Sequence, residues 1–341
     1  MKNSAKYSLN PRNKTARLYL AGAVFLILAA AAGILLGSSH LTFSEIRQAF
    51  EEGFASSPGA RIFGYVRLPR TLASLVCGAA LASSGAVIQA VLANRLASPG
   101  IIGVNAGAGL AVTLCTAAGI FGGWYLPVSA FFGAFLSVTL VGLGAQKWGA
   151  SRGTVILLGV AMNSLLGAVS DTVITFLPDA AVMSNDFRIG EFSSVTWQRL
   201  IPAVVLIGGA LAVLLTLGNA LDVLTLGDEN ARGLGMNTQA ARTLFLLLAA
   251  LLAGCAVSLA GLLSFVGLIV PNIMRRLSGS RSDHLIGLCA LYGGAFVCFC
   301  DTAARTLFTP YEIPVGIIMA FLGAPFFVFI LIKGRGGDSR D

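Results

Sequence analysis

Residues 244–274 read LFLLLAALLAGCAVSLAGLLSFVGLIVPNIM, and this apolar stretch decides how often the chain crosses a membrane. One transmembrane helix needs about 20 apolar residues, so the stretch is too long for one span and short for two. Two glycines and a proline interrupt it, at Gly261, Gly267 and Pro271. Broken helices are tolerated at membrane depth where other helices surround them. We therefore predict a full span over 243–263 and a short, broken span over 264–275.

Apolar runs of similar length lie on both sides of this stretch. They predict eight further spans, over 18–37, 71–92, 99–120, 127–146, 154–177, 200–219, 284–306 and 314–333. Hydrophobic residues make up 56% of the 341 residues and charged residues 11%, whereas a soluble domain carries about 25% charged residues. We predict an all-α membrane protein with ten transmembrane helices, in which one domain over 18–333 lies between tails over 1–17 and 334–341.

The first apolar run, 18–36, could also be a signal peptide, because five Lys and Arg residues precede it. Its length of about 19 residues exceeds the usual signal-peptide core of roughly 7–15. No convincing cleavage site follows, and more apolar runs come after it. We interpret it as the first transmembrane helix.

The basic residues predict the orientation. Of the 23 Lys and Arg residues, 16 fall in segments that the ten-span topology places on the same side as both termini. The positive-inside rule makes that side the cytoplasm, so the net charge of +8 needs no nucleic acid to explain it. Without the split near Gly261, Lys333 and Arg335 would lie outside. We predict that both termini are inside.

Glycine spacing suggests a repeat. Gly78 and Gly85 are seven residues apart in the second predicted span, and Gly254 and Gly261 are seven apart in the seventh. These two spans run in opposite directions, so helices 2–5 and 7–10 could be inverted repeats, as in many transporters. Such spacing also arises by chance, and both readings stay open.

The polar stretch before residue 244 is LDVLTLGDENARGLGMNTQAART, residues 221–243. Glycine commonly ends a helix and asparagine caps one, so we predict a short helix over 228–234, stopped by Gly235, and a second helix from near Asn237. On the outer side, residues 42–52 predict another short surface helix. A polar helix–turn–helix between spans is too structured for a connector, and we predict that a partner outside the membrane binds it.

The sequence offers little for catalysis or metal binding. No P-loop pattern, G-x-x-x-x-G-K-[ST], is present. Gly149, Ser151 and Gly153 match the G-x-S-x-G nucleophile elbow, but they lie between membrane helices with His284 as the only later histidine. Six cysteines lie in apolar runs without metal-type spacing, at Cys77, Cys115, Cys255, Cys289, Cys298 and Cys300, which is typical of small buried side chains. We expect neither an enzyme nor a metal site.

Ionisable residues within the spans are functional candidates. Asp171 lies two turns beyond Asn163 in the fifth span, with a local hydrogen bond or a pathway role as the alternatives. Asp301 and Arg305 can pair at i,i+4, although near the outer surface such a pair contributes little. Arg67 and Arg70 open the second span and either anchor it at the interface or bind an acidic partner.

Four blocks of sequence resemble the FecCD family of ABC importer permeases, which serves iron–siderophore, haem and cobalamin uptake. The longest is RLPRTLASLVCGAALASSGAVIQAVLANRLASPGIIGVNAGAGL over 67–110. The others are LGDENARGLGMN (226–237), GLLSFVGLIVPNIMRRLSG (261–279) and EIPVGIIMAFLGAPFFVFIL (312–331). Together they cover most of the chain from residue 67 onward, in the family's order.

The resemblance implies a permease subunit for a ferric siderophore or related metal chelate in the cytoplasmic membrane of a bacterium. It implies three partners: a dimer of cytoplasmic ATPase subunits that use ATP, a second permease subunit, and an extracytoplasmic binding protein. It assigns ATPase coupling to Asp228, Glu229, Arg232, Gly233, Leu234 and Gly235, and binding-protein docking to Arg67, Arg70 and Arg305. Gate or pathway candidates are Ser151, Arg152, Gly153, Asn163 and Asp171. No cofactor bound to this chain and no nucleic acid are expected.

Two points stay open. The family commonly has histidine after the proline of its V-P-H motif, where this chain has Asn272, so a proton-linked role there is in doubt. The alternative function is a secondary transporter or channel that works without an ATPase. Neighbouring genes for an ATPase and a binding protein would support only the importer.

Overall fold

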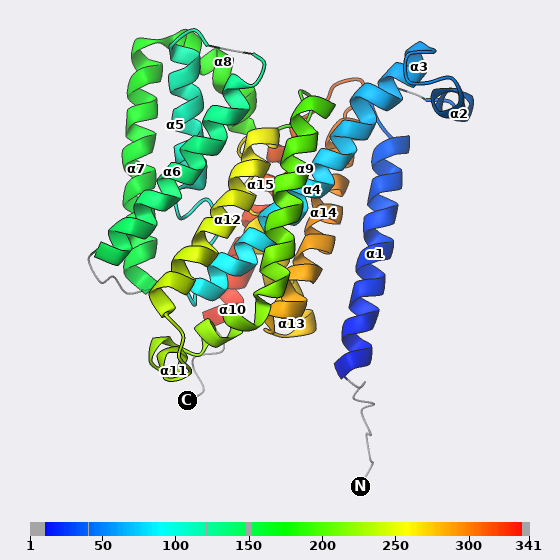
Figure 1. Ribbon diagram of the computed structural model, residues 1–341. Coiled ribbons are helices and arrows are strands. Elements are labelled where there is room, and N and C mark those ends of the chain that lie inside the picture. Colours follow the sequence, from blue (N-terminus) through cyan, green and yellow to red (C-terminus); the bar gives the residue numbers. More distant parts are fainter. Residues whose placement is uncertain (1–10, 40, 121, 148–151, 336–341) are drawn as a thin grey trace.

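The computed structural model describes residues 11–39, 41–120, 122–147 and 152–335, and every regular element within these ranges is a helix (Figure 1). Seven long helices are apolar enough to cross a membrane. They are α1 (Pro11–Leu35), α4 (Leu68–Val91), α6 (Tyr125–Lys147), α7 (Arg152–Phe176), α9 (Trp197–Thr216), α12 (Thr238–Ala260) and α14 (Ser282–Thr306). Three further helices complete the bundle, α5 (Val104–Ala117), α13 (Val266–Ser278) and α15 (Val315–Arg335). The prediction of an all-α membrane protein is confirmed.

Each of the ten predicted spans coincides with one of these helices, but several boundaries differ. The second helical run begins well before residue 71, because α3 (Pro58–Arg61) and the π-helix η1 (Ile62–Arg67) lead directly into α4. The third is shorter than predicted, because residues 92–103 form a loop. Helices α8 (Pro178–Ile189) and α10 (Gly218–Thr225) were not predicted. How many of the helices cross a membrane, and in which direction, stays a prediction.

The predicted split after α12 is confirmed. Gly261 ends α12 with φ of +71°, a left-handed conformation that favours glycine. Residues of α8 and the loop after it hold the broken segment: Leu262 N donates to Phe187 O at 2.9 Å, and Glu191 N donates to Ala260 O at 2.8 Å. Helix α13 starts only at Val266, and Pro271 lies inside it. The break is therefore a defined loop, and Gly267 and Pro271 do not interrupt the helix.

Helix α4 is the buried centre of the bundle, packed against α12, α13 and α14. Two of its glycines permit this packing, because a Cβ on Gly78 would overlap Gly293 O of α14 and one on Gly85 would overlap Gly267 O of α13. Small residues allow membrane helices to approach this closely. Gly254, in contrast, faces Phe131, and Gly261 lies outside its helix. The two glycine pairs therefore have different environments, and the inverted repeat stays a prediction.

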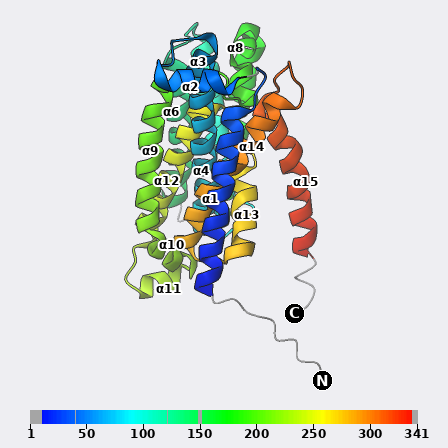
Figure 2. The ribbon, with the colours of Figure 1, turned by 90° about the vertical axis from the view of Figure 1, so that its right-hand side faces the viewer.

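The bundle has two distinct ends (Figure 1). One, here called the α11 end, carries α10, the short helix α11 (Asp228–Gly233), the start of α1 and the last turn of α15. The other, called the α8 end, carries α8, α3 and the predicted short surface helix α2 (Phe43–Glu51), which has Thr42 as its N-cap. Helices α1 and α15 lie at the periphery of the bundle (Figure 2).

Candidate functional site

The polar stretch at the α11 end has the predicted helix–turn–helix form. Gly227 and Gly235 flank α11 with φ of +102° and +81°, and Asn237 caps α12 by accepting from Ala240 N at 3.0 Å. An ion pair fixes the two helices to each other, since one Arg242 nitrogen lies 2.9 and 3.0 Å from the Asp228 carboxylate oxygens. The segment is thus held in one shape by its own contacts.

The outer surface of this segment combines apolar and charged side chains. Leu226 and Leu234 are 56% and 67% exposed, while Ala231 between them is fully buried. Glu229 and Arg232 are exposed beside them. Exposed apolar side chains rimmed by polar ones mark protein interaction sites. The structure therefore brings the six predicted coupling residues together on one small protruding surface.

The α11 end is also tied to α14, a contact that the sequence did not reveal. Asp222 of α10 accepts a hydrogen bond from Ser282 N, the first residue of α14, at 2.9 Å. Gly218 packs so closely that a Cβ there would lie 2.9 Å from Asp283 Cα. Helix α10, which leads directly into α11, is therefore fixed to the first residues of α14.

Backbone conformation at Gly235 gives a direct test of this shape. Gly235→Ala is expected to cost about 1–2 kcal/mol, because L-residues resist the left-handed region. Gly233→Ala is the matched control: both glycines have open space around them, but only Gly235 has positive φ. In the helix, alanine is favoured over glycine by roughly 0.5–1 kcal/mol. Hydrogen exchange over residues 228–237 should therefore speed up in the first variant and not in the second.

A buried cluster of charges lies at the α8 end. Arg70 contacts Asp301 at 3.0 Å and Glu312 at 2.7 Å, and Arg305 lies 3.3 Å from the same Asp301 carboxylate. Asp301 is 0% exposed, and Arg70 and Arg305 are 6% and 3% exposed. The predicted i,i+4 pair of Asp301 and Arg305 is present, but both side chains are buried rather than exposed at the surface, and the strength of the pair stays a prediction. Low dielectric makes such a cluster far more sensitive to the loss of one member.

Two of the arginines hold the end of α1. Arg67 donates to the carbonyls of Ile34 and Leu35 at 3.0 and 2.8 Å, and also to that of Ser39. Arg305 donates to Gly33 O at 2.8 Å. The last carbonyls of a helix lack partners within the helix, and positive charge is favourable there. The arginines predicted to dock a binding protein thus contact their own chain, and the docking role stays a prediction.

Glu312 completes the cluster, although its only signal in the sequence is that of a lone acidic residue before a predicted span. It accepts from Ser38 Oγ at 2.7 Å as well as from Arg70. Burial alone would raise the pKa of Glu312, but the hydrogen bonds from Ser38 and Arg70 and the charges of Arg70 and Arg305 outweigh it and lower this pKa. Its carboxylate therefore stays ionised in the folded protein.

This lowered pKa predicts a loss of stability in acid. The carboxylate stabilises the fold above the unfolded-state pKa of about 4.3, and that contribution is lost as the pH falls through the lower folded-state value. When the pH is lowered from roughly 6 to 3, the midpoint temperature of thermal unfolding should fall further for the wild type than for Glu312→Gln. An equal fall of the unfolding temperature with pH in the two proteins would contradict a lowered pKa of Glu312.

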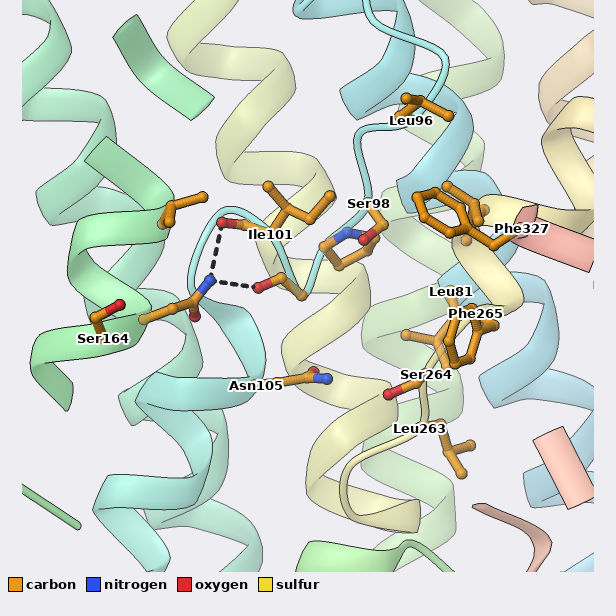
Figure 3. A pocket seen from close by; sticks show the side chains of 16 residues that line it. Leu81, Leu96, Ser98, Ile101, Asn105, Ser164, Leu263, Ser264, Phe265 and Phe327 are labelled. Carbon is orange, nitrogen blue, oxygen red and sulfur yellow. Dashed lines mark hydrogen bonds between the residues drawn. The ribbon is translucent and has the colours of Figure 1, made fainter. Parts of the chain in front are cut away.

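A cavity of about 450 Å³ lies among the helices of the bundle (Figure 3). Its wall is formed by helices α7 and α15, by the loop that precedes α5, and by the break that precedes α13. Asn163 of α7 shapes this wall, because its amide nitrogen donates to Gly100 O and Ile101 O at 2.9 and 3.0 Å. The predicted pathway residue Asn163 is thus a lining residue and also a support of the adjoining loop.

Phe265 is an unpredicted member of this cavity. Its φ is +67°, a region that bulky residues rarely occupy and that is associated with functional sites. This conformation starts α13 and turns the ring against α15, where a Cβ on Gly323 would overlap it. Phe327 of α15 lies on the same wall (Figure 3).

The other predicted gate and pathway residues are dispersed. Asp171 is exposed on α7, where its backbone carbonyl accepts from Thr175 Oγ1 at 2.7 Å. Arg152 and Gly153 begin α7, and Ser151 lies outside the described residues. Asn272 donates to Arg95 O at 2.9 Å and to Leu268 O at 2.8 Å, so it ties α13 to the loop after α4. The gating roles of these residues stay predictions.

Comparison with known proteins finds a family and relatives that match almost the whole chain. Residues 24–333 match the FecCD transport family. An uncharacterised ABC transporter permease, YvrB of Bacillus subtilis (strain 168), is 34% identical over 96% of this chain and 97% of its own length. From the same organism, the Fe(3+)-citrate permease YfmD is 35% identical over 80% of this chain and 82% of its own length. The iron(3+)-hydroxamate permease FhuG is 36% identical over 79% of this chain and 83% of its own length.

A solved structure agrees with these relatives. It is described as an inward-facing conformation of a metal-chelate type ABC transporter, and it superposes with a TM-score of 0.80 at 29% identity, covering 94% of this chain and 99% of that one. Fold and site together define a multi-pass helical membrane permease. The chain belongs to the FecCD transport family.

Proposed function

We propose that this chain is the transmembrane permease subunit of an ATP-binding-cassette importer that carries a ferric siderophore, or a related metal chelate, across the cytoplasmic membrane of a bacterium. The observation that carries the proposal is the rigid, exposed α11 segment in a chain of this transport family. The sequence has no P-loop of its own, so the energy of ATP must enter through contact with another subunit. The α11 segment is the surface best built for that contact.

The proposed assembly places ATPase subunits against the α11 end, in the cytoplasm, and a binding protein against the α8 end, outside the cell. A second permease subunit would cover α7. The support for this last partner is the surface of α7, which exposes Asp171 and Thr172. Charged side chains in a span are costly in lipid and usually face a protein interior or an aqueous cavity. The neighbouring genes would show whether the second subunit is a copy of this chain or a homologue.

Reconstitution of the complete transporter tests this function. Vesicles that contain the permease, its ATPase and the binding protein should take up an iron-55 chelate only when ATP is supplied on the cytoplasmic face. A variant ATPase that binds but does not hydrolyse ATP should stop uptake. Uptake by the permease alone, driven by an ion gradient, would instead establish the secondary transporter or channel.

A further inference from the structure

The cavity between α5, α7, α13 and α15 is electrically neutral. The sixteen described residues that line it include no Asp, Glu, Lys, Arg or His, and their polar members are Ser98, Asn105, Asn163, Ser164 and Ser264. Leucine, phenylalanine, proline and glycine form most of the remainder. An ion that entered this space would lose water without gaining a counter-charge, which is unfavourable in an apolar surrounding.

Several of the polar groups retain hydrogen-bonding capacity. Among the described residues, Ser98, Asn105, Ser164 and Ser264 make no side-chain hydrogen bond to the rest of the chain, whereas the Asn163 amide nitrogen is used by the adjoining loop. Figure 3 shows Asn105 of α5 and Ser264 of the break before α13 pointing toward one another. Ligand sites are typically apolar with a few such placed polar groups. The cavity therefore suits a molecule with amide, hydroxyl or hydroxamate oxygens and no net charge.

We propose that this cavity contacts the chelate during transport and favours an electrically neutral one, of the ferric tris-hydroxamate class. The inference rests on the proposed importer function. Three hydroxamate groups each carry one negative charge and neutralise Fe³⁺, whereas three catecholates leave a net charge of −3 and citrate chelates are also anionic. The family does not decide between these classes, since its hydroxamate and citrate relatives are almost equally similar to this chain.

The test uses three chelates that differ only in one pendant group. A linear ferric tris-hydroxamate with a free terminal amine carries +1, its N-acetyl form carries 0, and its N-succinyl form carries −1. Uptake of each is measured in vesicles that contain the complete transporter. Because the binding protein also meets the chelate, the measured quantity is the ratio of variant to wild-type uptake for each chelate, in which the unchanged binding protein cancels.

The substitutions place charge in the cavity. Asn105→Asp should lower uptake of the anionic chelate about tenfold relative to the cationic one, and Asn105→Lys should reverse this order; tenfold corresponds to about 1.4 kcal/mol. Asn105→Leu is the uncharged control and should change all three uptakes by one common factor. Ser264→Asp, at an exposed position across the cavity, repeats the test if a charge at Asn105 prevents assembly.

The outcomes separate the two proposals. Charged variants should shift the uptake ratios of the three chelates by the sign of their charge, whereas Asn105→Leu should leave the three ratios equal. Equal ratios for all three chelates in every variant, with ATP-driven uptake intact, would overturn the cavity assignment alone. Absence of ATP-dependent uptake of any chelate by the wild-type complex would instead refute the importer function itself.

Discussion

Deletion of residues 228–235 is expected to abolish ATP-driven uptake while leaving membrane insertion intact. The segment makes its own structure from the Asp228–Arg242 ion pair and the α12 cap, and most of its remaining side chains face outward. Its removal therefore takes away a partner-binding surface but little of the helical core. Uptake should fall to background, and the ATPase should no longer co-purify with the permease.

Point variants test the contact with the ATPase without removing the segment. Leu234→Asp introduces a charge at a 67% exposed position, so the fold should tolerate it, whereas an apolar contact with the ATPase should not. Phe43→Asp, at an 82% exposed position on α2, is the matched control at the opposite end. Co-purification and ATPase stimulation should be lost only in the first. An ATPase that still co-purifies normally after the deletion would refute the coupling assignment.

Asp301→Ala is expected to be the most destabilising single substitution in the membrane region. It leaves Arg70 and Arg305 close together without the carboxylate that both contact, in a site where all three residues are buried. Removal of one partner from a buried ion pair typically costs about 3–5 kcal/mol. The thermal unfolding temperature of the detergent-solubilised protein should drop, together with its yield from membranes.

Compensating changes separate charge from packing at this cluster. Replacing buried charges together with apolar residues of similar size is often neutral. Arg70→Met with Asp301→Leu and Arg305→Met, combined with Glu312→Gln to remove the charge that Arg70 pairs, should therefore recover part of the stability that Asp301→Ala loses. Arg47→Ala, which breaks an exposed pair with Glu51, should change stability by less than about 1 kcal/mol. A loss for Asp301→Ala as small as that for Arg47→Ala would show that the cluster does not stabilise the fold.

Local sequence signals predicted the helices well. Apolar length located all ten of the main helices, Gly261 located the break, and Asn237 and Gly235 located the turn beside α11, because each of these effects acts within a few residues. Helix α8 was missed because its sequence, PDAAVMSNDFRI, has no apolar run. Helix α10 was missed because it continues the apolar pattern of α9 after a single residue, Leu217.

Contacts between distant residues could not be predicted in the same way. Arg70 and Asp301 are 231 positions apart, and nothing in either neighbourhood indicates that α1 and the loop before α15 cover both. The same holds for Asn105 and Ser264, which lie far apart in the sequence and both line the cavity. The resemblance named the residues of the α11 segment and of the arginine cluster, but only the structure separated the exposed group from the buried one.

The attachment of α1 has a consequence for how the chain is made. Helix α1 precedes the other described helices in the chain, yet Arg305 lies 272 residues after its partner Gly33 in the last turn of α1, and Glu312 lies 274 residues after its partner Ser38. During synthesis α1 is therefore made before these two partners, and some carbonyls of its last turn then lack their hydrogen-bond donors. The position of α1 therefore depends in part on α14 and the loop before α15, so chains truncated before α14 should hold the end of α1 only through Arg67.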